Sequence, residues 1–97
     1  MDDFLLNYKA GPNWKKLGPQ DSPVAEHFAW VRGQHAAGAI RLAGPYLDLP
    51  GALALVRARS ADEVAALCAS DPAIQAGFFV VESVRPLKLM VGTGEQP

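Results

Sequence analysis

Two helix-start signals divide this chain into strand-like and helix-like segments that alternate along it. At Ser22-Pro23 the serine hydroxyl can cap a helix, and the proline fits the first turn, where its missing N–H is not needed. Ser60-Ala61-Asp62-Glu63 is a capping box: the serine hydroxyl accepts from the Glu63 amide, and the Glu63 carboxylate reaches back to the Ser60 amide. Segments rich in strand formers flank both signals, so we expect both helices to pack on a sheet.

The order of the predicted elements is strand, helix, strand, strand, helix, strand. The strands are predicted at residues 4–9, 39–43, 53–58 and 78–84. This is the order of the split βαβ motif, so we predict a ferredoxin-like α+β fold: an antiparallel four-stranded sheet with two helices on one face. Asp71-Pro72 predicts a further helical turn capped by Asp71. Pro86 is expected to end the last strand, after which residues 87–91 either add an edge strand or cross to a partner.

Apolar spacing predicts which faces are buried. On the first strand, Phe4, Leu6 and Tyr8 share one face. The first helix is expected to bury the stripe Val24, Phe28, Val31 and His35 and to end at Gly38, and the second to bury Val64, Leu67 and Cys68. We interpret His35 as structural and Cys68 as a small buried hydrophobe. Trp14 is the expected anchor of an irregular loop between Gly11 and Pro19.

The size of the chain favours self-association. Its 97 residues make one domain, 1–97, with 92–97 as an expected frayed tail, and a single cysteine excludes an intrachain disulfide. Residues 52–56 and 78–81 are apolar on both faces of their strands, which indicates that the sheet face opposite the helices is covered too. We expect a homodimer.

Charge and motifs exclude several classes of partner. Nine Lys and Arg balance ten Asp and Glu, without the basic concentration that nucleic-acid binding needs. The N-terminal residues lack signal-peptide features and no apolar run is long enough to cross a bilayer, so we expect a cytoplasmic protein without a membrane partner. No metal-ligand cluster and no Gly-rich phosphate motif occurs, so we expect neither a metal nor a cofactor.

Six segments together resemble the YCII-related family. They are 4–14, Ala25-Glu26-His27-Phe28, Leu42-Ala43-Gly44-Pro45-Tyr46-Leu47-Asp48, Ser60-Ala61-Asp62-Glu63, Asp71-Pro72-Ala73-Ile74-Gln75-Ala76-Gly77-Phe78-Phe79 and Val84-Arg85-Pro86-Leu87. Each is weak alone, but the six keep one order over nearly the whole chain. The chain departs from the family at Leu87, where Trp often follows Arg-Pro. The resemblance implies a dimeric α/β barrel, with two ferredoxin-like sheets face to face and a His–Asp pair in a cleft.

The resemblance places that pair on His27 and Asp71. Helical spacing puts His27 at the margin of the apolar stripe, from which it could reach a cleft. An imidazole can move a proton near neutral pH, and a carboxylate on its other nitrogen would fix its orientation. Asp48 is the reserve candidate for this carboxylate. The plainer interpretations are a solvated histidine and an Asp71 that only caps a helix.

Two classes of function follow. The wider superfamily contains muconolactone isomerase and a chlorohydroxyquinol dehydrochlorinase, so the resemblance implies a small-molecule lyase or isomerase that acts on a small organic acid or cyclic compound by His–Asp acid–base chemistry. The alternative is a non-catalytic dimer that binds a metabolite or serves as an accessory module. In either case, Tyr8, Trp14, Tyr46 and Asp48 are the candidate substrate-binding residues.

Overall fold

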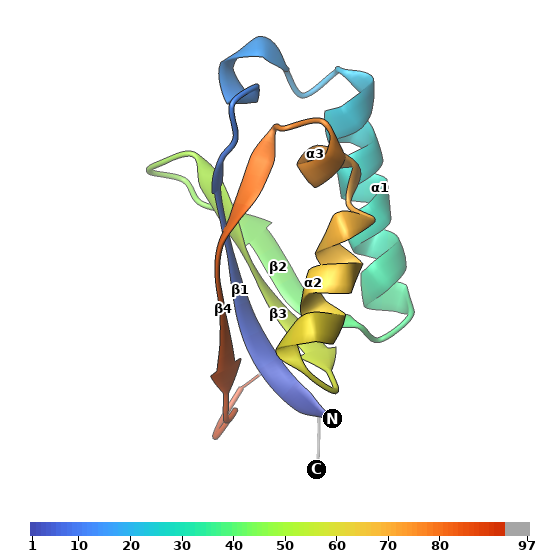
Figure 1. Cartoon of the computed structure of the whole chain (residues 1–97), viewed down its shortest axis with the longest axis vertical. Helices are drawn as coiled ribbons and strands as arrows, with labels where there is room; N and C mark the ends of the chain where they lie inside the picture. The colour runs from blue at the N-terminus through green and yellow to red at the C-terminus, as the bar shows by residue number, and fades with distance from the viewer. Residues whose placement is uncertain (93–97) are drawn as a thin grey trace.

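The computed structural model describes residues 1–92 and contains one four-stranded antiparallel sheet (Figure 1). The expected tail, apart from Gly92, lies outside the described residues. The strands are β1 (Asp2–Ala10), β2 (Ile40–Pro45), β3 (Gly51–Ala58) and β4 (Phe79–Leu87), in the order β2-β3-β1-β4. The helices are α1 (Ser22–Ala36), α2 (Ala61–Ala69) and the short α3 (Pro72–Gln75). The fold is ferredoxin-like α+β, as predicted.

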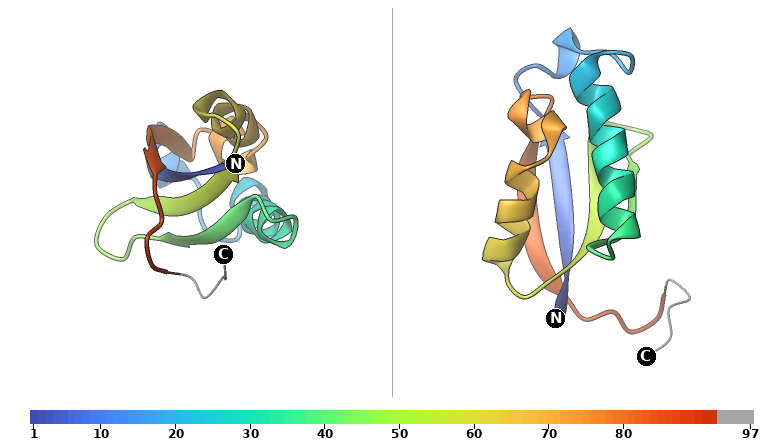
Figure 2. Two further views of the ribbon diagram at one scale, coloured as in Figure 1. Left: turned by 90° about the horizontal axis from the view of Figure 1, so that it is seen from below. Right: turned by 90° about the vertical axis from the view of Figure 1, so that its right-hand side faces the viewer.

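Helices α1, α2 and α3 lie on one face of the sheet (Figure 2). The core is formed between these helices and the inward side chains of the strands, among them Phe4, Leu6 and Tyr8 of β1. The predicted inward face of the first strand is therefore confirmed. From α2, Val64 and Cys68 enter the same core as predicted, while Leu67 is only partly buried.

Both helix-start predictions needed correction in detail. Helix α1 has Asp21 at its N-cap position, and the Ser22 hydroxyl donates instead to the Glu26 carboxylate at 2.6 Å. In α2 the Ser60 hydroxyl accepts from the Glu63 amide as predicted, but the Glu63 carboxylate accepts from the amide of Arg59. The Asp21 carboxylate makes no capping hydrogen bond in α1 and accepts instead from the Gly18 amide.

The buried stripe of α1 differs from the predicted one. Val24 and His27 are its buried residues, Val31 is only partly buried, and Phe28 is 42% exposed. His27 therefore lies on the inward face rather than at its margin. Helix α1 packs against α3 and β2, so its inward face is set by where those elements lie.

Pro86 does not end the last strand. Strand β4 continues to Leu87, and Pro86 lies in register with Phe4 of β1. Because β4 is an edge strand, a proline whose nitrogen side faces away from β1 removes no ladder hydrogen bond. Residues 88–91 add no further strand.

The loop from Gly11 to Pro19 is more ordered than predicted. It contains a short 3-10 helix, η1 (Trp14–Lys16), and is attached to the turn between α3 and β4. The amide of Asn13 donates to the Gly77 carbonyl at 2.8 Å, and the Asn13 side-chain amide donates to the Ala76 carbonyl at 2.9 Å. Gly77 has a φ of +72°, which a side chain would strain, and a Cβ there would lie 2.9 Å from the Asn13 side chain.

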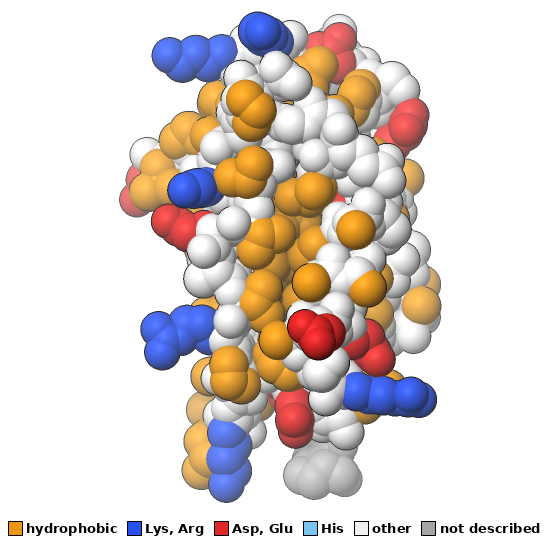
Figure 3. Space-filling model, viewed as in Figure 1, with side chains coloured by type: hydrophobic (Ala, Val, Ile, Leu, Met, Phe, Trp, Pro, Cys, Tyr) orange, Lys and Arg blue, Asp and Glu red, His pale blue; other side chains and the backbone are white. Residues whose placement is uncertain are grey.

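The surface has no concentrated charge on the face in Figure 3. Charged side chains are scattered, and hydrophobic ones gather along the seam between β4 and the helices α2 and α3. Within residues 1–92, no helix is long and apolar enough to cross a bilayer.

Candidate active site

Asp71 is fully buried at the junction of α2 and α3. Its backbone is extended and Pro72 follows, so it caps α3 by accepting from the Ala73 amide at 2.9 Å. The carboxylate also contacts His27 and Tyr8. A carboxylate has enough acceptor sites for all three partners, so the predicted capping role and the predicted histidine contact coexist.

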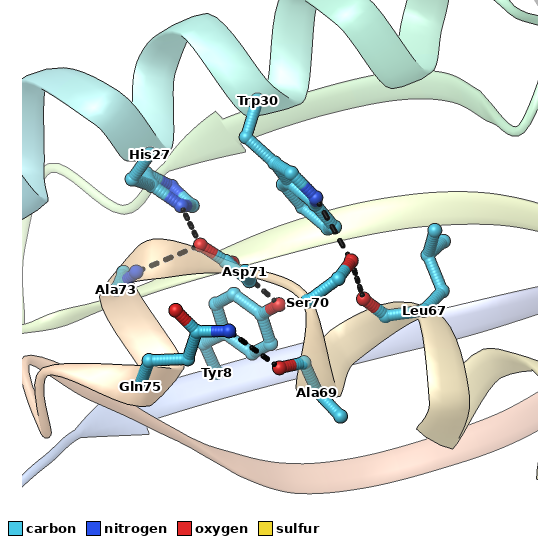
Figure 4. Close-up of polar contacts among 9 residues, drawn as sticks. All are labelled: Tyr8, His27, Trp30, Leu67, Ala69, Ser70, Asp71, Ala73 and Gln75. Atoms are coloured by element: carbon cyan, nitrogen blue, oxygen red, sulfur yellow. Dashed lines mark hydrogen bonds and ion pairs between the residues drawn. The ribbon is translucent and has the colours of Figure 1, made fainter.

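His27 reaches this carboxylate from α1 (Figure 4). Its Nδ1 lies 2.7 Å from Oδ1 of Asp71, and its side chain is almost as buried as that of Asp71. Tyr8 O–H and the Ala73 amide also donate to the carboxylate, as expected around an ionised acid. An ionised carboxylate can only accept, so Nδ1 carries the proton of this contact.

Tyr8, on β1, is the third side chain of this polar cluster. Its hydroxyl donates to Oδ2 of Asp71 at 2.8 Å. Burial, reinforced by the neighbouring Asp71 charge, raises the pKa of the Tyr8 phenol far above its ordinary range, so the hydroxyl keeps its proton. Burial also raises the pKa of the nearby Cys68 thiol, which keeps this side chain neutral and matches the predicted small hydrophobe.

Trp30 is a site residue that the sequence reasoning missed. Its indole lies nearly parallel to the His27 ring, with centroids 6.3 Å apart, and its N–H donates to the Ser70 hydroxyl at 3.0 Å. Two side chains one turn apart on α1 are thus attached to the consecutive residues Ser70 and Asp71 (Figure 4). The spacing of His27 and Trp30, three residues apart on a helix, was the signal that could have identified it.

A cavity of about 470 Å³ opens beside the His27 ring. It lies among α1, the loop before it, and the strands β2 and β3. The aromatic side chains that line it are Tyr8, Trp14, Phe28, Trp30, Tyr46, Phe78 and Phe79. The other lining residues are aliphatic, glycine or proline, apart from His27, so the wall is almost wholly apolar.

Three of the four predicted binding residues line this cavity. Trp14 packs on Phe78, with centroids 4.6 Å apart, and so is held at the wall as the expected loop anchor. Tyr8 and Tyr46 also line the cavity, and the Tyr46 hydroxyl donates to the side-chain oxygen of Asn7. Asp48 lies exposed in the turn between β2 and β3 and does not line the cavity.

The second histidine has a local role. Nδ1 of His35 lies 2.7 Å from the Ile40 carbonyl, which connects the end of α1 to the start of β2. This agrees with the structural interpretation of His35. Within residues 1–92, no three His, Cys, Asp or Glu side chains lie close enough together to hold a metal ion.

The family model for the YCII-related domain matches residues 5–88, which is most of the chain. The chain belongs to the YCII-related family. This confirms the resemblance inferred from the six segments. No curated protein matches the sequence significantly.

A solved structure supports the fold of this YCII-related chain. It is the 5-chloro-2-hydroxyhydroquinone dehydrochlorinase TftG from Burkholderia phenoliruptrix AC1100, in complex with 2,5-dihydroxybenzoquinone. The match has a TM-score of 0.61 and 24% sequence identity, and it covers 92% of this chain and 95% of TftG. At this identity the similarity establishes the shared fold.

Proposed function

We propose that this chain is a cofactor-independent enzyme of lyase or isomerase type, in which His27 moves a proton on a small cyclic compound. The observation that carries the proposal is the buried 2.7 Å contact between His27 Nδ1 and Asp71, beside an apolar cavity that the same imidazole lines. Asp71 orients the ring and balances the charge that the ring gains when it takes up a proton.

The free nitrogen of the ring is the reactive one. Because Nδ1–H is directed at Asp71, the proton-accepting lone pair of the neutral imidazole lies on Nε2. Nε2 makes no hydrogen bond with any described residue of 1–92, while the ring itself faces the cavity. A substrate in the cavity would therefore meet an imidazole ready to act as a base.

The proposed reaction begins with transfer of a substrate proton to Nε2. In an isomerisation, the electron pair left behind shifts the double bond and the same proton returns at another atom. In an elimination, that pair forms a new double bond and the leaving group departs with its bonding electrons. Both reactions balance without an oxidant or reductant.

The shape of the cavity supports a planar ring as substrate. Aromatic side chains on several sides can stack on such a ring or meet its edge. TftG, which shares the fold, was solved with a small planar quinone. We therefore place hydroxyquinols, quinones and lactones first among the compounds to assay.

His27→Gln tests the proposal. Glutamine keeps a polar side chain at this position but cannot act as a base, so turnover of an accepted ring compound should fall about 10²- to 10⁴-fold. His35→Gln is the matched control and should keep its turnover, because His35 contacts the Ile40 carbonyl and is not among the residues that line the cavity. Undiminished turnover by the His27 variant would remove this residue from the chemistry.

A ligand-binding module without catalysis is the second candidate. An apolar cavity with few polar groups is also typical of sites that only hold a ligand. The two candidates differ in one measurement: a binding module would leave every bound ring compound unchanged and take up no solvent deuterium into it. The oriented imidazole favours the enzyme.

We also propose that the chain acts as a homodimer through the sheet face opposite the helices. Leu42, Leu55 and Leu5 lie side by side across β2, β3 and β1, on the side away from Phe4 and Leu6; Leu42 is 40% exposed, Leu5 is half-buried and Leu55 is already buried within the chain. A second copy would cover the exposed parts of Leu42 and Leu5. Light scattering at micromolar concentration should give twice the mass of the chain, and Leu42→Glu should lower it. A well-folded wild-type monomer would contradict the proposal.

A further inference from the structure

The cavity beside His27 lacks any positively charged side chain. None of its lining residues is a Lys, Arg, Asp or Glu. Residues 93–97, which lie outside the described part, contain no Lys or Arg either. Apart from His27, no described lining residue can carry a positive charge that would pair with an anionic group inside the cavity.

The polar partner of His27 behind the cavity wall is a carboxylate. Asp71 lies directly behind the His27 ring and is fully buried. When His27 is neutral, the pair carries one negative charge, and when His27 is protonated the pair is neutral overall. In neither state does it attract an anion from a distance.

The basic residues of η1 do not change this balance. Lys15 and Lys16 lie next to Trp14 in sequence, but both are exposed and neither lines the cavity. Their charges are surrounded by water, which weakens any attraction for an anion inside the apolar cavity. An anionic ligand would have to give up its hydration without gaining a Lys or Arg partner.

We infer that this cavity accepts uncharged planar ring compounds and rejects ring compounds that carry a carboxylate. The inference rests on the proposed function only in taking this cavity as the substrate site. The inference narrows the substrate class. Small organic acids were among the candidate substrates predicted from the sequence, whereas the residues that line the cavity disfavour them. Phenols, quinones and lactones without an acid group remain.

Calorimetric titration with an isosteric pair, 2-naphthamide and 2-naphthoate, tests the inference. The two probes have nearly the same shape and differ in charge near pH 7. The amide should bind at least about tenfold more tightly than the carboxylate. Equal binding of the two, tighter binding of the carboxylate, or binding of neither probe would overturn the inference.

Ala43→Lys supplies the missing cation. Ala43 is exposed on β2 yet lines the cavity, so a lysine there can be accommodated at the opening. The variant should reduce the preference for the amide several-fold, whereas Ala43→Met, of similar length and without charge, should keep it. An unchanged preference in the lysine variant would show that charge is not what selects the ligand.

The His27→Gln variant separates this inference from the proposed function. It should lose turnover but keep the preference for 2-naphthamide, because the cavity still lacks a cation. If it keeps turnover, the proton chemistry is wrong and the charge preference stands. If wild-type protein prefers 2-naphthoate while His27→Gln is inactive, the charge inference is wrong and the proton chemistry stands.

Discussion

Replacing Asp71 with alanine removes the acceptor of three donors at once. These are the ring N–H of His27, the hydroxyl of Tyr8 and the amide of Ala73. A buried donor without a partner costs about 1–3 kcal/mol, so the three together destabilise the fold by roughly 5 kcal/mol. Total stabilities of small domains begin at about that value. We expect Asp71→Ala to be largely unfolded.

Asp71→Asn should be much milder. The asparagine oxygen can take the place of Oδ1 between His27 and Ala73, and its NH₂ can donate to the Tyr8 hydroxyl, which rotates to accept. The variant loses the extra strength of hydrogen bonds to a charged group, but a neutral amide is easier to bury than a carboxylate. A net loss of about 1–2 kcal/mol is expected.

Urea unfolding followed by tryptophan fluorescence measures both variants. Asp48→Ala is the control, because Asp48 is exposed in the turn between β2 and β3, and its loss should change stability by no more than about 0.5 kcal/mol. If Asp71→Ala loses less than about 1 kcal/mol, the carboxylate is not the shared acceptor of three buried donors and the argument fails.

Three further predictions concern the groups around Asp71. The raised pKa of Tyr8 means that folding favours the neutral phenol. The stabilisation from this phenol is present below about pH 10 and is lost as the pH rises above that value. The difference in unfolding free energy between wild type and Tyr8→Phe, measured in urea, should therefore narrow between about pH 9 and 11. A constant gap would contradict the burial of this hydroxyl. The Cys68 thiol, buried and with a raised pKa, should react with a disulfide reagent much more slowly in native protein than in urea; equal rates would show that it is accessible. Trp30→Phe should lose about 1 kcal/mol, and Ser70→Ala should lose more, because it also removes the hydrogen bond from the Ser70 hydroxyl to the Leu67 carbonyl. The double variant should lose little more than Ser70→Ala alone; additive losses in a double-mutant cycle would count against the Trp30–Ser70 bond.

Local chemistry was enough to predict the fold and the local structure around Asp71. The alternation in β1 placed Phe4, Leu6 and Tyr8 on the core side, and Asp71-Pro72 predicted a capped turn that is present. Both signals depend on residues close together in sequence. An alternation of apolar and polar residues, or a capping residue before proline, predicts the same local structure in any tertiary setting.

The inward position of His27 could not be predicted in the same way. Apolar spacing favoured Phe28, because that reasoning assumes that a helix buries its most hydrophobic side. In this fold, Asp71 lies under α1 and offers the imidazole a buried partner, while Phe28 lines the cavity and stays 42% exposed. A polar residue is buried where its partner lies, and the partner is 44 residues away in sequence.

The edge position of β4 explains why the sequence wrongly predicted that Pro86 ends the last strand. Proline stops a strand that needs its N–H, and the sequence alone does not show that β4 has a neighbour on only one side. Trp30 was overlooked for a related reason: its acceptor, Ser70, comes close only after α1 and α2 have packed on the same sheet.

The orientation of the His27 imidazole is the basis of the whole account, and long-range proton–nitrogen NMR on uniformly ¹⁵N-labelled protein measures it directly. His27→Gln assigns the signals by removing one of the two histidine patterns. At a pH where the ring is neutral, we predict a protonated Nδ1 and an unprotonated Nε2, and 2-naphthamide should shift the His27 signals but not those of His35. A proton on Nε2 in the neutral ring, or His27 signals that do not respond to the ligand, would contradict the proposed base.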